Sequence, residues 1–455
     1  MKKKVILTIL SLIILLISLG YVLANFFVPP YIIKVEKQES IRYNDQVIIN
    51  VSVGTYKWKM NKDLWCILVE DDTKPSKTDS GWIKASNDYC SFTVPEGDYT
   101  AYVKDSYGNI GDINSAIVKI NKVLDIKTNK DILYMYIGRE ETISYDLVKL
   151  GNIDENVNFK SDNENIAKVD ENGKVTGVNI GETFITLSIG DTKKNVEVVV
   201  SSFITRPVIN TSKPYISCGQ FNKEDNDLLD AILADRVRDA GEGTRAGVVE
   251  AARFLALEFA FRVHYFYENG RLQNHGDELH VDGEGRYYHK GLYLDKSRYS
   301  LLESRFVGPA TWGCDLQNYT NWGPWVRGGM YPNGFDCSGF VTWALLNGGV
   351  DIGDIGAGPS DWHDLDEAGE KVYITDELMA SGRVKVGDLI GLPGHAAILA
   401  GWDDENYYIA ESLNTTKGVV MTVVNKSKLV HNSIYTYIIL MDNVYSGDGN
   451  LTNMW

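Results

Sequence analysis

The N-terminal segment decides where the rest of this chain can fold. Three lysines, Lys2–Lys4, precede an apolar run from Val5 to Ala24. Such a run is about long enough to cross a bilayer as a helix. The lysines favour a cytoplasmic start, which leaves everything after the run outside. A signal peptide cleaved after Ala24 is the alternative, because Val22 and Ala24 fit the small-residue rule. We favour a retained anchor because the run is longer than a usual signal core, and both alternatives predict export.

Length and charge narrow the remaining possibilities. The chain has 455 residues, which is too long for one hydrophobic core and suggests about three domains. Its formal net charge is −16, which argues against a nucleic-acid partner, since such partners need clustered Lys and Arg. The same charge argues against simple electrostatic attraction to an anionic polymer or lipid surface. Affinity for such a surface must therefore come from a specific groove.

The cysteine count points to one free thiol. An exported chain with five cysteines has an odd one left after pairing. We expect two bridges, Cys66–Cys90 because both lie in one small β-rich segment, and Cys218–Cys314 by elimination. Cys337 then stays free. The alternative in which no cysteine pairs stays open at this stage.

A first β-rich domain is expected over residues 31–123, after Pro29 and Pro30 end the apolar segment. Short β-type runs alternate with turns, as in Val47–Val53. The stretch Cys90–Asn109 has the pattern of two strands around a Pro-Glu-Gly-Asp turn. Together these runs predict an all-β sandwich.

A second β-domain is expected over residues 124–202. Asn172-Gly173 lies between alternating apolar residues, which is a strong hairpin signal. The stretch Ser161–Gly190 resembles the bacterial Ig-like domain, group 2. The resemblance implies a spacer or an adhesive module on the cell surface. We favour the spacer over a ligand-binding role.

The third domain is expected over residues 212–445, after a linker at Arg206 and Pro207. All seven histidines fall in it. An apolar stripe predicts a helix from Thr244 to Glu268, and a second helix should start at Asp336–Cys337 and end at Gly348-Gly349. Strand-like runs follow, at Gly387–Leu392, His395–Trp402, Tyr407–Ser412, Val419–Val424 and Tyr435–Leu440. Helices followed by antiparallel strands predict an α+β fold.

Cys337 has the surroundings that a nucleophilic thiol needs. A thiol attacks a carbonyl as the thiolate, which the N-terminus of a helix and a nearby imidazole both favour. Asp336 is a good N-cap residue, so Cys337 should lie in the first turn of the second helix. Gly334 and Gly339 let the backbone bend and a substrate approach. An inert buried thiol is the alternative.

His395 is the expected base, because it opens a strand directly after Pro393-Gly394. A third group should orient its imidazole, and the next strand offers Glu411 or Ser412. An odd-numbered loop between the strands would bring Glu411 to the His395 face, and an even one would bring Ser412. We favour Glu411 because a carboxylate supports an imidazolium better than a hydroxyl does.

These segments together resemble a known family. YPNGFDCSGFVTWAL, VKVGDLIGLPGHAAILAGW and YYIAES are similar to the NlpC-type cell-wall peptidases of the papain-like superfamily, over about residues 247–440. The resemblance implies Cys337 as nucleophile, His395 as base and a polar orienter matched best by Glu411. It also implies that Tyr265 reaches the thiol, and that the substrate is a peptide bond of peptidoglycan stem peptides.

The chain departs from this family in two ways. The family's orienter is usually His, Asn or Gln, where this chain has Glu411. Residues 270–330 also separate the first helix from the nucleophile, where the family has a short glycine-rich link. This insert contains Trp312, Trp322 and Trp325, which either line the substrate groove or belong to a packed excursion held by Cys314.

A metal site in the same insert is a weaker hypothesis. The polar residues there do not follow the HExxH spacing and no cysteine pair accompanies them, so a solvated loop is favoured. They are His275, Asp277, Glu278, His280 and His289.

The sequence thus predicts a multidomain chain with an N-terminal membrane helix over residues 1–28, two all-β Ig-like sandwiches and a C-terminal α+β papain-like domain. We expect an exported endopeptidase that cleaves peptidoglycan stem peptides, needs no cofactor and binds no nucleic acid. The alternatives are a surface adhesin or scaffold with an inactive peptidase-like domain, and an amidase or acyl transferase with the same nucleophile.

Overall fold

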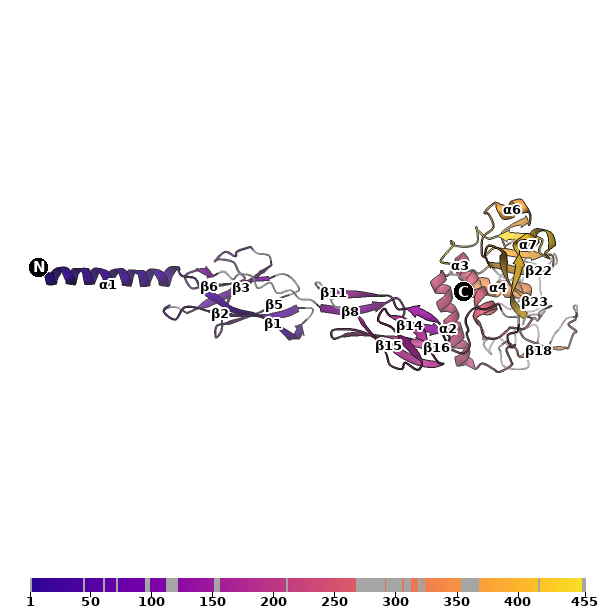
Figure 1. Cartoon of the computed structure of the whole chain (residues 1–455), viewed down its shortest axis with the longest axis horizontal. Helices are drawn as coiled ribbons and strands as arrows, with labels where there is room; N and C mark the ends of the chain where they lie inside the picture. The colour runs from indigo at the N-terminus through magenta and orange to yellow at the C-terminus, as the bar shows by residue number, and fades with distance from the viewer. Residues whose placement is uncertain are drawn as a thin grey trace. The chain divides into compact units, whose positions relative to one another are not determined.

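A computed structural model describes most of the chain. The described residues are 2–43, 46–59, 62–70, 73–94, 99–111, 122–150, 156–209, 212–266, 291, 305–306, 312–317, 321, 324–352, 368–415 and 418–451. In chain order they form an apolar helix, two β-rich segments and a mixed α and β part (Figure 1). Two compact units are distinguished: residues 1–129, 144–158 and 187–194, and residues 130–143, 159–186 and 195–455. The predicted domain boundaries stay predictions.

The first helix, α1 (Lys2–Phe27), follows from the apolar run at the N-terminus. Its stretch Ile6–Phe27 is long and apolar enough to cross a membrane, which a signal sequence also satisfies. The helix ends just before Pro29 and Pro30, because proline cannot continue the hydrogen-bond pattern.

Two antiparallel sheets follow, and they share one core. The first contains β1 (Tyr31–Tyr43), β2 (Gln46–Gly54) and β5 (Tyr89–Val94). The second contains β4 (Ile83–Lys84), β3 (Leu64–Glu70), β6 (Tyr99–Asp105) and β7 (Ile110–Gly111). Val51 from the first sheet and Val103 from the second are fully buried in the same cluster. The Cys66–Cys90 disulfide confirms the predicted pair and joins β3 to β5.

The two strands expected within Cys90–Asn109 are present, but they are not partners of each other. β5 pairs with β2 and β6 pairs with β3, so the chain crosses from one sheet to the other between them. The predicted Pro-Glu-Gly-Asp turn lies outside the described residues. Sequence spacing alone does not distinguish a hairpin from such a crossing.

The predicted Asn-Gly hairpin of the second β-segment is confirmed. β13 (Ala167–Val169) and β14 (Lys174–Gly177) pair with Val169 opposite Val175. Gly173 has φ +78°, a conformation that favours glycine. The other strands here are β8 (Lys122–Thr128), β9 (Ile132–Met135), β10 (Glu140–Thr142), β11 (Tyr145–Leu150), β12 (Asn158–Ser161), β15 (Gly181–Ile189) and β16 (Thr192–Val200).

The helix predicted from Thr244 to Glu268 is wrong at its C-terminal end. Thr244 is the N-cap as expected, but α3 (Arg245–Arg253) continues only as the π-helical turn η1 (Phe254–Glu258). The Lys213 ammonium donates to the carbonyls of Leu257 and Phe259, at 2.7 and 2.8 Å. Because this buried cation satisfies the last carbonyls, the helix stops although the apolar pattern continues. The preceding helix, α2 (Lys223–Ala240), was missed by the sequence analysis.

A six-stranded sheet organises the C-terminal part. Its order is β20 (Glu370–Tyr373), β25 (Tyr437–Leu440), β21 (Leu389–Leu392), β22 (His395–Trp402), β23 (Asn406–Leu413) and β24 (Gly418–Asn425). The runs predicted as strands after the second helix are all present. One face packs on α3 and on α4 (Cys337–Asn347), and the other on α6 (Asp376–Ala380) and α7 (Lys426–Asn432). A separate three-stranded sheet consists of β17 (Arg305–Phe306), β18 (Asp315–Gln317) and β19 (Met330–Pro332).

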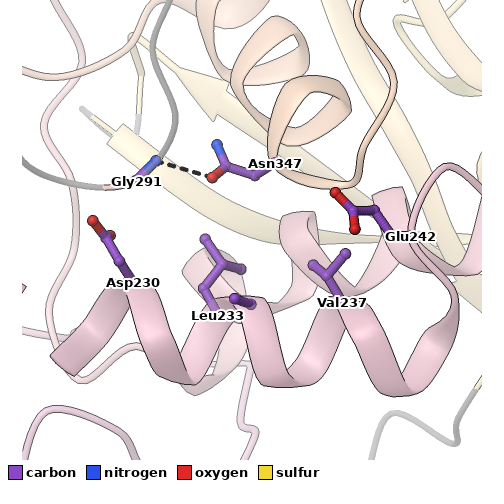
Figure 2. A pocket seen from close by; sticks show the side chains of 7 residues that line it. Asp230, Leu233, Val237, Glu242, Gly291 and Asn347 are labelled. Atoms are coloured by element: carbon purple, nitrogen blue, oxygen red, sulfur yellow. Dashed lines mark hydrogen bonds between the residues drawn. The ribbon is translucent and has the colours of Figure 1, made fainter. Parts of the chain in front are cut away.

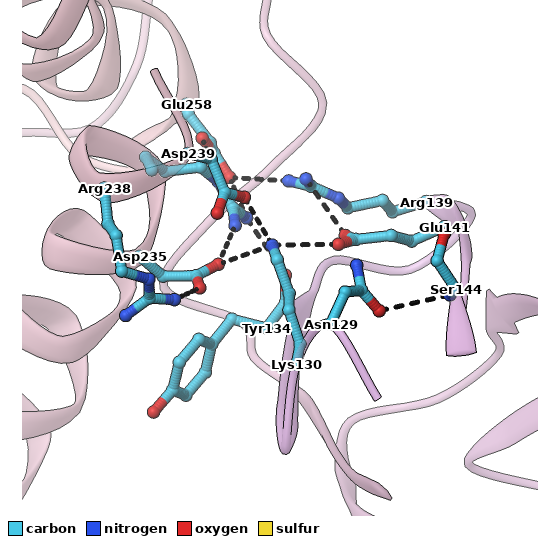
Figure 3. Close-up of polar contacts among 11 residues, drawn as sticks. Asn129, Lys130, Tyr134, Arg139, Glu141, Ser144, Asp235, Arg238, Asp239 and Glu258 are labelled. Atoms are coloured by element: carbon cyan, nitrogen blue, oxygen red, sulfur yellow. Dashed lines mark hydrogen bonds and ion pairs between the residues drawn. The ribbon is translucent and has the colours of Figure 1, made fainter. Parts of the chain in front are cut away.

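A network of buried charges ties residues 130–141 to α2 and η1 within the second compact unit (Figure 3). Asp235, which is 1% exposed, contacts Arg236 at 3.1 Å and Lys130 at 3.2 Å. Arg236 also binds Glu258 at 2.9 Å. These buried charges stabilise one another, because a buried charge without an opposite partner carries an uncompensated desolvation cost.

The network yields a stability prediction. We expect Asp235→Ala to lower the free energy of unfolding of this unit by about 3 kcal/mol, because it removes the buried carboxylate that Arg236 and Lys130 share. Asp227→Ala is the matched control on the same helix, since Asp227 is exposed and its pair with Lys223 is worth about 0.5 kcal/mol or less. Urea denaturation of both variants measures the difference. Equal losses of unfolding free energy in the two variants would show that the buried network does not contribute the proposed stability.

Candidate active site

Cys337 lies where the sequence predicted, in the first turn of α4. Asp336 is the N-cap, and its Oδ1 accepts from the Gly339 backbone N–H at 2.7 Å. The thiol is 7% exposed, and it is the free cysteine, because the four others form the predicted Cys66–Cys90 and Cys218–Cys314 pairs. The positive end of the helix dipole therefore lies beside this sulfur.

The backbone leading to Cys337 is held by a neighbouring segment. Phe335 N–H donates to the His264 carbonyl at 2.9 Å. A Cβ built on Gly334 would lie 2.0 Å from that carbonyl oxygen, so the close approach requires glycine. The Ser412 hydroxyl on β23 also donates to the Phe335 carbonyl, at 2.7 Å. These contacts hold the backbone before Cys337 from two sides.

His395 begins β22 directly after the turn that joins β21 to β22. Leu392 pairs with His395, and Gly394 in the turn has φ +85°. The Cys337 thiol points toward this turn, with Sγ 3.9 Å from the Gly394 carbonyl oxygen. The two predicted reaction partners thus come together from α4 and from the start of β22.

The identity of the group beside His395 depends on an irregularity in the strand pairing. The loop between the paired Trp402 and Tyr407 has four residues, 403–406, and an even loop should have favoured Ser412. The register shifts, however, between Leu399 and Gly401, so that Ala400 is an extra residue on β22. This bulge restores Glu411 to the His395 face. The loop-parity argument was incomplete because a bulge has no clear signature in the sequence.

Glu411 contacts His395 directly. His395 Nε2 lies 2.6 Å from Glu411 Oε2, and the carboxylate is fully buried. Burial lowers the pKa of His395, but hydrogen bonds to Cys337 and Glu411 outweigh it and raise this pKa to about 9. Because Glu411 occupies Nε2, the ring nitrogen left for the sulfur is Nδ1. The geometry can therefore hold an imidazolium between a thiolate and a carboxylate.

Tyr435 is a member of this cluster that the sequence analysis missed. Its hydroxyl donates to Glu411 Oε2 at 2.8 Å, and its ring centroid lies 6.3 Å from that of His395. Burial and the adjacent carboxylate raise the pKa of Tyr435, which keeps the hydroxyl protonated as a donor. The only sequence signal for Tyr435 is its position just before β25, and a tyrosine beside a strand is too common to indicate a site residue.

Tyr265 lies in the segment that pairs with the residues before Cys337. It follows His264, which pairs with Gly334, and its ring lies against Trp325 with centroids 5.6 Å apart. Its expected contact with the thiol stays a prediction.

The insert contributes to packing where it is described. Trp312 is fully buried and meets Phe335 edge to face at 4.8 Å, which favours the packed excursion for this residue. Trp322 and the polar residues weighed as metal ligands lie outside the described residues. These are His275, Asp277, Glu278, His280 and His289.

A separate pocket of about 250 Å³ lies at the other end of α4, against α2 (Figure 2). Gly291 N–H donates to Asn347 Oδ1 at 2.9 Å, and the Trp343 indole donates to the Gly291 carbonyl at 3.0 Å. With Cys337 at the first residue of α4, this pocket lies about 15 Å along the helix from the sulfur. It is therefore distinct from the cysteine and histidine cluster.

Comparison with protein families supports the sequence resemblance. Residues 146–200 match the bacterial Ig-like domain (group 2), and residues 323–436 match the NlpC/P60 family. The chain therefore carries these two family segments in the order that the sequence predicted. The NlpC/P60 match indicates a cell-wall peptidase or hydrolase, in a family whose members are generally cysteine peptidases or amidases. The Ig-like domain and the apolar helix fit an extracytoplasmic protein.

Individual relatives are distant. An uncharacterised protein of Clostridium acetobutylicum is 28% identical over 155 residues, which cover 32% of this chain and 37% of that protein. Among solved structures, domains 4 and 5 of the S-layer protein SbsC are 25% identical, with 24% of this chain and 69% of theirs covered and a TM-score of 0.18. The insect immune protein hemolin is 17% identical, with 38% and 46% covered and a TM-score of 0.21. Scores this low do not define the fold of the chain.

The charge on His395 yields a testable prediction. We expect Glu411→Gln to lower the pKa of His395 from about 9 toward its ordinary value of 6.5, by about one to two pH units, because the opposite charge is lost. NMR titration of the histidine ring protons measures this, with the His395 signal assigned from a His395→Gln sample. Glu405→Gln, an equal charge change at an exposed position of the β22–β23 loop, is the control and should leave the titration in place.

The same raised pKa gives the sign of a stability effect. Protonation of His395 favours the folded state, so its contribution is fully present below about pH 6.5 and is lost as the pH rises through about 9. Glu411→Gln should reduce this loss. A titration unchanged by Glu411→Gln would show that the carboxylate is not what holds the proton.

Proposed function

We propose that this chain is an exported cell-wall hydrolase that cleaves peptidoglycan stem peptides with Cys337 as nucleophile. The observation that carries the proposal is the imidazole of His395, which is hydrogen-bonded to Glu411 and whose pKa is raised by its interactions with Cys337 and Glu411. A buried thiol at a helix N-terminus beside a charged imidazole is the arrangement that makes a cysteine reactive near neutral pH. The NlpC/P60 match over residues 323–436 supports peptidoglycan as the substrate class.

The reaction needs two steps and no cofactor. In the first, the Cys337 thiolate attacks the carbonyl carbon of a stem-peptide amide, the C–N bond breaks, and the His395 imidazolium gives its proton to the leaving amine. In the second, His395 takes a proton from water, whose oxygen attacks the resulting thioester and releases Cys337. We assign the Cys337 backbone N–H, at the start of α4, to the oxyanion of both steps.

Glu411 and Tyr265 have supporting roles in this proposal. Glu411 orients the imidazole through Nε2 and stabilises its charge, and Tyr435 in turn donates to the same carboxylate oxygen. Tyr265 is assigned to the thiol side of the groove, because its segment pairs with Gly334. A glutamate in place of the family's usual neutral orienter favours the charged imidazole, which suits leaving-group protonation.

The rest of the chain is proposed to place this site in the cell wall. The apolar helix would anchor the chain in the cell membrane, with two Ig-like sandwiches over residues 31–123 and 124–202 before a papain-like domain over residues 212–445. The two disulfides suit an oxidising exterior. An acidic surface gives no general attraction to an anionic wall, so stem-peptide binding must come from the groove.

Two alternatives use the same fold differently. A scaffold or adhesin with an inactive peptidase-like domain would not need the Cys337, His395 and Glu411 cluster, which argues for the enzyme. An amidase or acyl transferase would keep the cluster and change the bond or the acceptor. The reaction products distinguish these.

The central prediction concerns Cys337→Ala. We expect wild-type protein to release stem-peptide fragments from purified peptidoglycan and Cys337→Ala to release none above background, because no nucleophile remains. Mass spectrometry of the digests measures the release and identifies the bond. Cys337→Ser, which keeps the size of the side chain, separates loss of thiolate chemistry from altered packing.

Three outcomes are informative. Cleavage within the stem supports the endopeptidase, and release of whole stems from the sugar chain indicates an amidase. Equal release by wild type and Cys337→Ala would end the proposal.

A further inference from the structure

The backbone carbonyl of the bulged residue Ala400 accepts hydrogen bonds from an arginine on helix α3. Arg253, the last residue of α3, donates from Nε and Nη2 to the Ala400 carbonyl, at 2.9 and 2.6 Å. Both residues are buried, and Arg253 Nη1 contacts Glu250 at 3.1 Å. A bulge takes one residue out of the ladder. A buried carbonyl left without a donor costs about 1 to 3 kcal/mol, so the two Arg253 donors stabilise the bulged backbone.

The bulge decides which side chain of β23 faces His395. On the loop side of Ala400, Gly401 pairs with Tyr408, and on the other side Leu399 pairs with Ile409. If the Gly401–Tyr408 pairing continued along β22 without the extra residue, Ser412 would lie on the His395 face. The Leu399–Ile409 pairing, which the structure has at the His395 end of β22, places Glu411 there instead.

Polarity on the two faces of β23 does not choose between these registers. Residues 407–412 are buried on both faces, so a one-residue slip would expose no apolar face to water. A specific interaction at the bulge is therefore needed to favour one register. The forked guanidinium is suited to this, because two of its N–H groups meet one carbonyl oxygen from the helix side.

From this geometry we infer that Arg253 is a positioning residue for the active site, which holds the Ala400 bulge and thereby sets Glu411 against His395. The inference rests on the proposed function of the Cys337 and His395 pair. It adds a residue from α3 to the set that determines the chemistry.

The test uses the reactivity of Cys337, which needs no peptidoglycan. Iodoacetamide alkylation of the full-length chain is followed by intact mass across about pH 5 to 10. In the wild type we expect a step in rate near pH 9, where the imidazolium beside the sulfur loses its proton. Among the residues that the structure describes, the titratable groups facing His395 are Cys337 from α4, Glu411 from β23 and Tyr435 from the segment before β25.

Arg253→Met should move this step to lower pH by about one unit, as Glu411→Gln should, because the carboxylate no longer faces the ring. The direction separates this from direct electrostatics, since removing a nearby cation would by itself move the step to higher pH. Combining Arg253→Met with Glu411→Gln should give no further movement. Arg253→Lys, which keeps a cationic donor, should restore part of the wild-type position.

Lys213→Met is the matched structural control. It removes another buried cation that binds backbone carbonyls near the end of the same helix, and those carbonyls are not on β22. We expect it to lower stability and leave the step in place. An Arg253→Met step at the wild-type pH, or an equal movement in Lys213→Met, would refute the positioning role.

Deleting Ala400 in the Arg253→Met background is a second test. The pairs on both sides of Ala400 then form one regular ladder with Glu411 still on the His395 face, so the step should return toward pH 9. A folded double variant in which the step stays low would refute the inference. Failure of the proposed function is distinguishable, because wild type would then leave peptidoglycan intact while Arg253→Met still moved the alkylation step.

Discussion

The buried carboxylate of Glu411 is the constraint on which the site depends. Removing a carboxylate from water costs several kcal/mol unless charges and donors replace the solvent. Here the replacement is an imidazole and a tyrosine hydroxyl on the same oxygen, from β22 and from the segment before β25. The cost of burial therefore favours the protonated imidazole, which interacts with Cys337 at the start of α4.

That arrangement draws on segments far apart in the chain. The residues before Cys337 are held by the backbone of His264 and the hydroxyl of Ser412, while the thiol faces the Gly394 turn. Ser412 and Glu411 are neighbours on one strand, so their side chains point to opposite faces. One strand thus holds the backbone before Cys337 with one face and the His395 imidazole with the other, so its register decides which groups meet at the candidate site.

Local patterns predicted much of this, and tertiary contacts decided the rest. The α4 start, the His395 strand and the Asn172-Gly173 hairpin follow from capping, turn and alternation rules, and the structure has all three. The helix after Thr244 ends ten residues before the predicted Glu268, because Lys213, distant in sequence, satisfies its last carbonyls. Tyr435 and the Ala400 bulge were not predictable, since each depends on a partner that only the folded chain brings near.

The placement of the thiol has a consequence for the protein's lifetime. If the chain is exported as proposed, it works without the cytoplasmic glutathione and thioredoxin that rescue oxidised cysteines. The four other cysteines are paired in disulfides, which leaves no neighbouring thiol to reduce a sulfenic acid at Cys337. Oxidation of that sulfur to a sulfinic or sulfonic acid would permanently remove the proposed nucleophile. Its low exposure therefore matters for durability as well as for reactivity, because limited access slows peroxide as it does any other solute.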